Sequence, residues 1–214
     1  MGKLNETTGA LSGLVGTVVA SSWRGIRYLK HKGRKSKKPR SIKQLQHQAK
    51  IGLVSKFVYS MKGLLDQSFI SFAIKKTGTN AAFSYNLKNC ITGEYPSYAI
   101  NYGLVLVSRG DIPNAINPAV TMNGNGEVRF TWSDNSGTGM AKAGDKGIGV
   151  IHCPEFNITV YTKGTDTRQS GLAVLSLNGM PQLKGKTLET WLAFISANGM
   201  EGADSVYTGQ VVVG

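Results

Sequence analysis

Residues 124–133 read GNGEVRFTWS, and no other stretch of the chain indicates its fold class as directly. A turn sequence at 124–126 leads into an alternation in which Val128, Phe130 and Trp132 are apolar and the residues between them are polar. A period of two is typical of a β-strand that buries one face and exposes the other. This stretch therefore predicts a strand that follows a tight turn.

Similar short apolar runs, separated by turn residues, occupy most of the chain after residue 113. Their ranges are 148–152, 156–161, 172–177, 188–196 and 205–213. About seven strands in about 100 residues, with a tryptophan early in the series and a paired final hairpin, are typical of two packed antiparallel sheets. We therefore predict an immunoglobulin-like or fibronectin type III-like β-sandwich over residues 114–214.

Residues 1–113 predict a separate module of mixed structure. Its expected elements are a β-hairpin formed by strands around 15–20 and 26–29, a basic arm, a long basic amphipathic helix over 41–66, a short helix over 80–92 closed by Gly93, and one or two strands within 98–108. The long helix is the clearest of these, because Ser41 and Gln44 form a capping box ahead of apolar residues at helical spacing. The whole chain is thus predicted to be α+β and mainly β.

The positive charge of the chain is concentrated in its first third. The formal net charge is +13, and thirteen lysines and arginines lie between Arg24 and Lys62 with no acidic residue among them. Residues 1–76 hold 16 basic residues against Glu6 and Asp66, whereas the remainder is almost neutral. Charge confined to a short segment creates a local potential that attracts a polyanionic partner.

We predict that this segment carries a surface for nucleic acid or another polyanion. The candidate binding residues are Arg24, Arg27, Lys30, Lys32, Arg34, Lys35, Lys37, Lys38, Arg40, Lys43 and Lys50. Trp23 and Tyr28 are candidates for stacking on bases, although a packing role explains either residue equally well. Lysine and arginine neutralise phosphates without reading sequence, and no sequence-reading motif accompanies them, so low specificity is expected. A solvated face without a partner is the alternative interpretation of such a charge run.

The sequence offers no residue set that supports catalysis or cofactor binding. Fragments similar to catalytic or phosphate-binding motifs occur at 76–78 and 185–187, but each lacks the companion residues that its chemistry requires. The three histidines and two cysteines are too scattered to hold a metal. His152 is expected to be a core or edge histidine, and Cys90 and Cys153 to be reduced, buried and inert. We therefore predict a non-enzymatic protein with no cofactor and no metal.

No export or membrane signal is recognisable in the sequence. The apolar run at 11–20 is interrupted by glycines and follows no basic region, and no run approaches the roughly 20 apolar residues needed to span a bilayer. We therefore expect synthesis in the cytoplasm without a signal peptide, followed by incorporation into a particle or release by lysis.

Several short motifs spread over the chain resemble those of one protein family. They are GLVGTVV at 13–19, SWRGI at 22–26, QLQHQAK at 44–50, NAAFSYN at 80–86, VSRGD at 107–111, TWSDNSG at 131–137 and LAFIS at 192–196. Together they resemble a family of uncharacterised Bacteroidota proteins of similar length, known only as a domain of unknown function. The resemblance implies membership of that family and brings no assigned activity.

Two functions from different classes fit these patterns. The first is a structural, self-assembling protein, such as a component of a phage-like or virion-like particle, whose basic arm contacts nucleic acid or another polyanion. The alternative is a β-sandwich interaction or adhesion module whose arm docks on an acidic protein or a membrane surface. We prefer the first, because a glycine-rich hairpin that admits close backbone approach and a strong charge partition both suit assembly. It predicts a homo-oligomer or a larger assembly.

Overall fold

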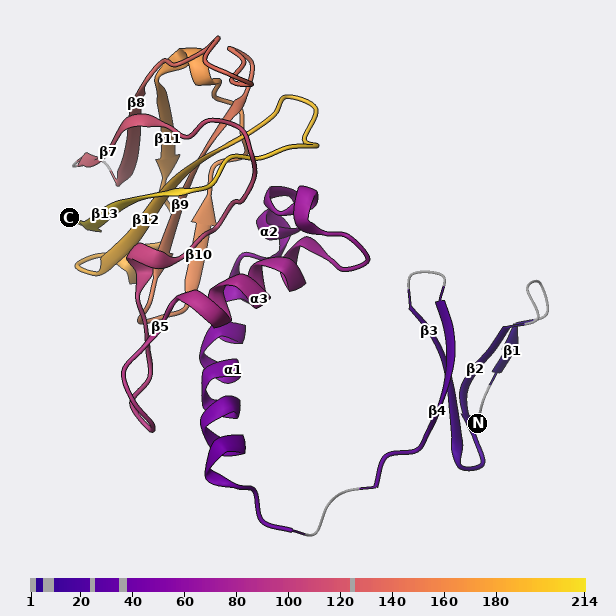
Figure 1. The fold of residues 1–214 in the computed structure, drawn as a ribbon. Helices are drawn as coiled ribbons and strands as arrows, with labels where there is room; N and C mark the ends of the chain where they lie inside the picture. Colours follow the sequence, from indigo (N-terminus) through magenta and orange to yellow (C-terminus); the bar gives the residue numbers. More distant parts are fainter. Residues whose placement is uncertain (1–2, 6–9, 24–25, 35–37, 124–125) are drawn as a thin grey trace. The chain divides into compact units, whose positions relative to one another are not determined.

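The computed structural model describes residues 3–5, 10–23, 26–34, 38–123 and 126–214. The chain divides into two compact units, Met1–Ile42 and Lys43–Gly214, which are drawn in Figure 1. The predicted boundary near residue 114 falls inside the second unit. The reason is that helices before this position pack against strands that follow it.

The described residues of the first unit form a single antiparallel sheet of four strands. In sequence order they are β1 (Lys3–Asn5), β2 (Ala10–Val15), β3 (Val18–Trp23) and β4 (Ile26–His31). β3 pairs with β4 as the predicted hairpin requires, and β2 and β1 extend this sheet on the other side of β3. Gly16 forms the turn between β2 and β3 with a φ of 58°, a left-handed conformation that glycine adopts without strain.

Two helices open the second unit where one long helix was predicted. They are α1 (Ile42–Ser60) and α2 (Lys62–Ser68). The break lies at Met61, which is buried and has φ −126° and ψ 27°, outside helical geometry. The sequence gives no sign of this break, because the apolar periodicity continues from Phe57 to Leu65 and both segments contribute to the same core.

The next helix, α3 (Gly78–Asn89), begins at Thr77, whose hydroxyl accepts a hydrogen bond from Asn80 N at 3.1 Å. α3 ends at Asn89, before the predicted end at residue 92. Gly93 does not cap it, because this glycine belongs to the turn of a short hairpin formed by β5 (Ile91–Thr92) and β6 (Ala99–Ile100).

The segment 98–108, predicted as one or two strands, is mostly irregular. Within it, only β6 is a strand, and a 3-10 turn follows at Tyr102–Leu104. The Asn86 side chain donates to Leu106 O at 3.0 Å and accepts from Leu106 N at 3.1 Å. Because this buried amide satisfies the backbone, the apolar run enters the core without joining a sheet.

Seven strands of the described residues form two antiparallel sheets in the remainder of the second unit. The orders are β10-β9-β12-β13 and β11-β8-β7. Their bounds are β7 (Ile116–Asn123), β8 (Glu127–Ser133), β9 (Lys146–Cys153), β10 (Ile158–Tyr161), β11 (Leu172–Ser176), β12 (Thr187–Ile195) and β13 (Val206–Val212). The alternation in β8 is confirmed, since Val128, Phe130 and Trp132 are buried. The fold is therefore mainly β, as predicted.

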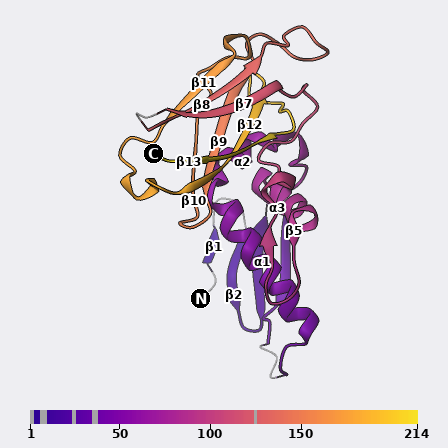
Figure 2. The same ribbon diagram turned by 90° about the vertical axis from the view of Figure 1, so that its left-hand side faces the viewer.

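The four-stranded sheet of this unit is covered on both faces. One face shares a core with the three-stranded sheet, in which Phe130 and Phe194 are fully buried. The other face packs against the helices through Trp191 of β12 and Phe57 of α1 (Figures 1 and 2). The double cover explains why β9 and β12 are buried along nearly their whole length.

A buried arginine joins several loops to these packed sheets. Arg168 is fully buried, and its Nε donates to Asp145 Oδ2 at 3.2 Å. Its other nitrogens donate to Asn135 Oδ1 at 2.6 Å and to Pro113 O at 3.0 Å. The guanidinium also lies 3.8 Å from the centroid of the Phe194 ring. Burial lowers the pKa of Arg168, and the charge of Asp145 offsets part of that shift.

Candidate polyanion-binding surface

β4 is exposed at every position and forms one edge of the N-terminal sheet. Because strand side chains alternate, Arg27 and His31 lie on one face, whereas Tyr28 and Lys30 lie on the other. The Lys30 ammonium is 6.0 Å from the centroid of the Tyr28 ring. Tyr28 is 41% exposed and is therefore not a core residue. The strand presents cationic side chains to solvent on both of its faces.

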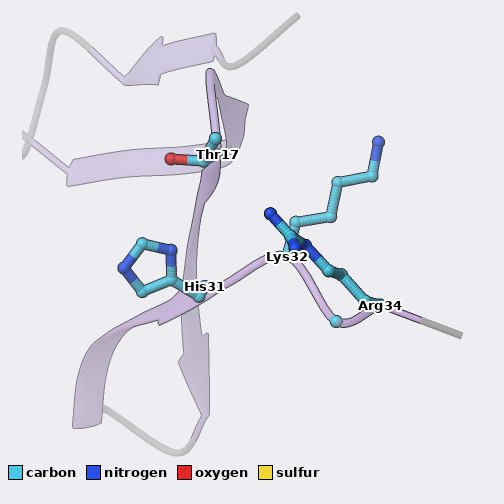
Figure 3. Close-up of a pocket in the computed structure, with 5 residues that line it drawn as sticks. Thr17, His31, Lys32 and Arg34 are labelled. Carbon is cyan, nitrogen blue, oxygen red and sulfur yellow. The ribbon is translucent and has the colours of Figure 1, made fainter. Parts of the chain in front are cut away.

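An open hollow of about 310 Å³ lies where β4 ends (Figure 3). Its lining residues are Thr17, His31, Lys32, Gly33 and Arg34. The chain is fixed there because Lys32 N donates to Thr17 O at 2.8 Å. In Figure 3, the Lys32 and Arg34 side chains extend on the side opposite the His31 ring. The ammonium and guanidinium groups of these two residues are suitable donors for a phosphate or a similar oxyanion.

The predicted binding residues fall in four places. Arg27 and Lys30 lie on β4, Lys32 and Arg34 line the hollow, Lys38 and Arg40 precede α1, and Lys43 and Lys50 lie on α1. All of these are exposed except Lys50, which is half-buried. Arg24, Lys35, Lys37 and the side chain of Trp23 lie outside the described residues. The described residues on β4, in the hollow and before α1 belong to the N-terminal unit, whereas Lys43 and Lys50 belong to the second unit.

Lys50 makes a contact that the sequence prediction missed. Its ammonium lies 4.8 Å from the centroid of the Tyr98 ring, a cation–π geometry. Tyr98 precedes β6, so the contact exists only because the β5–β6 hairpin lies beside α1. No local signal in the sequence relates these two residues.

The comparison with protein families concerns both units. The model of a family of unknown function, DUF6266, matches residues 10–209. The chain belongs to this family. The predicted resemblance to a domain of unknown function is thereby confirmed, and the DUF6266 region includes β2 to β4, the basic arm, the helices and both sheets of the second unit. No curated protein matches the chain.

The described part of this DUF6266 protein offers no metal centre, since no group of three or more His, Cys, Asp or Glu side chains there could hold an ion. Nor does any helix described here have the length and apolarity to cross a membrane. Cys90 and Cys153 are unpaired and buried, as predicted. Burial raises the pKa of the Cys90 thiol to about 12, which keeps it protonated and unreactive.

His152 of the DUF6266 protein is a core residue. It is 1% exposed, its Nδ1 lies 2.8 Å from Thr159 Oγ1, and the Phe57 ring packs edge-on at 4.9 Å between centroids. Burial lowers the pKa of His152 to about 4. The imidazole is therefore neutral at pH 7 and serves packing between α1 and the sheet.

We expect His152 to make the fold sensitive to acid. The ordinary pKa of 6.5 applies in the unfolded chain, so the unfolded state binds the proton first as the pH falls. Stability is then lost from about pH 6.5 down to the native pKa, by about 3 kcal/mol in total. Urea unfolding at pH 7 and near pH 4.5 measures this loss. His152→Gln should lose about 2 kcal/mol less than the wild type over that interval, and equal losses would refute the assignment.

Proposed function

We propose that this DUF6266 protein is a non-enzymatic structural protein that assembles with copies of itself and binds nucleic acid through its basic N-terminal unit. The observation that carries the proposal is the exposure of Arg27 and Lys30 on β4 and of Lys32 and Arg34 in the hollow. Residues 1–42 contain ten basic residues and a single acid, Glu6. With so few internal counter-ions, external anions must neutralise this unit, and a phosphate backbone supplies them at regular spacing.

The N-terminal sheet also supports assembly. Val15 and Leu29 are 51% and 71% exposed and lie on the same face of the sheet, so that face leaves large apolar side chains uncovered. A sheet needs a second layer to bury its apolar face, and a second copy of this unit would bring the same side chains together. Repulsion between two basic units opposes that pairing, and a bound polyanion removes the repulsion. Assembly and nucleic-acid binding are therefore coupled in this proposal.

The two packed sheets fit an immunoglobulin-like or fibronectin type III-like sandwich, which we propose as the scaffold. If β7 to β13 are labelled A, B, C, C′, E, F and G in chain order, the sheets become A-B-E and C′-C-F-G. This arrangement matches the partition of strands in that architecture. The helices that cover the C′-C-F-G sheet are an addition to it. A scaffold with both faces of one sheet covered suits a structural role.

The proposal is tested with the full chain, a short DNA duplex, a single strand of equal length and anionic lipid vesicles. At about 50 mM salt the protein should retard the duplex in a gel, and light scattering should show several protein chains per complex. If the mobility of neither the duplex nor a single strand of equal length changes, the nucleic-acid claim is removed. One chain per duplex would remove the assembly claim. Binding to vesicles without binding to either nucleic acid would favour an interaction module that docks on membrane surfaces.

A further inference from the structure

The second unit contains a groove between α1 and the β5–β6 hairpin, which lie side by side in Figures 1 and 2. Its lining residues are Ala49, Gly52, Leu53 and Lys56 of α1 together with Pro96 and Tyr98 of the hairpin. The groove has a volume of about 350 Å³, at the lower end of the range of about 300–1,000 Å³ for ligand sites. It is therefore suited to one small group.

Gly52 leaves the floor of this groove open. A Cβ added at Gly52 would meet no atom within 4 Å, so close packing does not require glycine there. The residue lies in the interior of α1, where glycine is destabilising relative to alanine. The stability of the helix thus gives no reason for this glycine. Its structural effect is that the helix carries no side chain at this position, between Ala49 and Leu53.

The groove is lined by the Tyr98 ring and by Lys56, and the side chains of Lys50 and Tyr95 lie next to Tyr98. The Lys50 ammonium lies 4.8 Å from the Tyr98 ring centroid, and the Lys56 side chain is exposed at the rim. Tyr95 is 42% exposed, and its ring centroid lies 6.3 Å from that of Tyr98. An apolar floor, the Tyr98 ring, and the ammonium groups of Lys56 and the neighbouring Lys50 match the parts of a nucleotide, which has an aromatic base and a charged phosphate.

We propose that this groove binds one nucleotide of a single-stranded nucleic acid, with the base on the floor between Gly52 and Tyr98 and its phosphates near Lys50 and Lys56. The inference rests on the proposed function and names the form of nucleic acid that the second unit recognises. Bases in a duplex are stacked and paired, so their faces cannot enter a groove of this kind. The N-terminal unit neutralises phosphates of either form, whereas the groove selects unpaired bases.

The test compares the full-length wild type with Gly52→Leu and Gly52→Ala, using a labelled oligothymidylate and a duplex of equal length as probes. Leucine fills the groove floor and favours helix, so Gly52→Leu should melt no earlier than the wild type. We expect Gly52→Leu to weaken oligothymidylate binding by about tenfold or more, the usual effect of losing one stacked base. Duplex affinity should change less than twofold. Gly52→Ala is the matched control. Its melting temperature should be higher than that of the wild type, and it should bind oligothymidylate more tightly than Gly52→Leu.

Tyr98→Ala supplies a second variant that leaves α1 intact, and it should also weaken oligothymidylate binding without changing the duplex affinity. The groove assignment is overturned if both variants bind oligothymidylate like the wild type, or if they lose both probes equally. Polyglutamate serves as a third probe: if the wild type binds it and Gly52→Leu loses that binding but retains oligothymidylate binding, the groove is a site for acidic peptide instead. If the wild type binds neither nucleic acid, the proposed function fails and the groove assignment with it. Binding that is unaffected in both variants refutes the groove alone.

Discussion

A quadruple glutamine variant of the basic residues on β4 and in the hollow is expected to weaken duplex binding roughly 1,000-fold at about 0.1 M salt. The variant replaces Arg27, Lys30, Lys32 and Arg34. Each phosphate contact contributes about 0.9 to the slope of log affinity against log salt, so four lost contacts remove roughly 3.6 from it. All four side chains are exposed, and the fold should be unaffected. Fluorescence anisotropy of a labelled duplex measures both quantities.

The matched control removes the same charge from the second unit. It replaces the exposed residues Lys142, Lys146, Lys163 and Lys184 by glutamine. Net charge falls equally in both variants, but the control should weaken binding less than about tenfold, because it removes no direct contact. Equal weakening by the two variants would show that overall charge is sufficient and that the N-terminal surface is not a site.

Arg168→Met is expected to lower the free energy of unfolding by about 3–5 kcal/mol, the largest effect of any single substitution considered in this protein. Methionine retains an apolar stem for packing against Phe194 but leaves Asp145 buried without a counter-charge. It also removes the donors to Asn135 Oδ1 and Pro113 O. An unpaired buried carboxylate is far less stable than a paired one. Urea unfolding near pH 7 measures the loss.

The double variant Arg168→Met with Asp145→Asn distinguishes this explanation from simple loss of packing. Asp145→Asn alone leaves the buried guanidinium unpaired and should also be strongly destabilising. With both charges removed, the loss should be smaller than the sum of the two single losses by at least about 2 kcal/mol. Strictly additive losses would mean that the two residues act independently and that the ion pair does not hold these loops together.

Those parts of the fold that depend on local patterns were predictable from the sequence. The strand at 127–133 was found because burial of one face imposes a period of two on Val128, Phe130 and Trp132. The helix break at Met61 could not be predicted, because apolar residues on both sides of it face one core. The irregular path of residues 101–108 was also missed, since it depends on the distant side chain of Asn86.

The candidate site likewise combines features that depend on local sequence patterns with features that depend on residues distant in the sequence. Exposure of Arg27 and Lys30 follows from a local excess of charge, which the sequence displays directly. The groove could not be predicted, because it requires the β5–β6 hairpin to lie beside α1 and bring Tyr98 to Lys50. The structural role of Arg168 was likewise invisible, because its partners lie far from it in the sequence.

The salt dependence of duplex binding by the wild-type chain tests most directly whether the N-terminal unit neutralises phosphates. Association constants are measured by anisotropy between about 50 and 200 mM salt. With the four exposed basic residues each in contact with a phosphate, the logarithm of the constant should fall linearly against the logarithm of salt with a slope of about −4 or steeper. No saturable binding at the lowest salt, or a slope near zero, would contradict a polyanion-binding role for this unit.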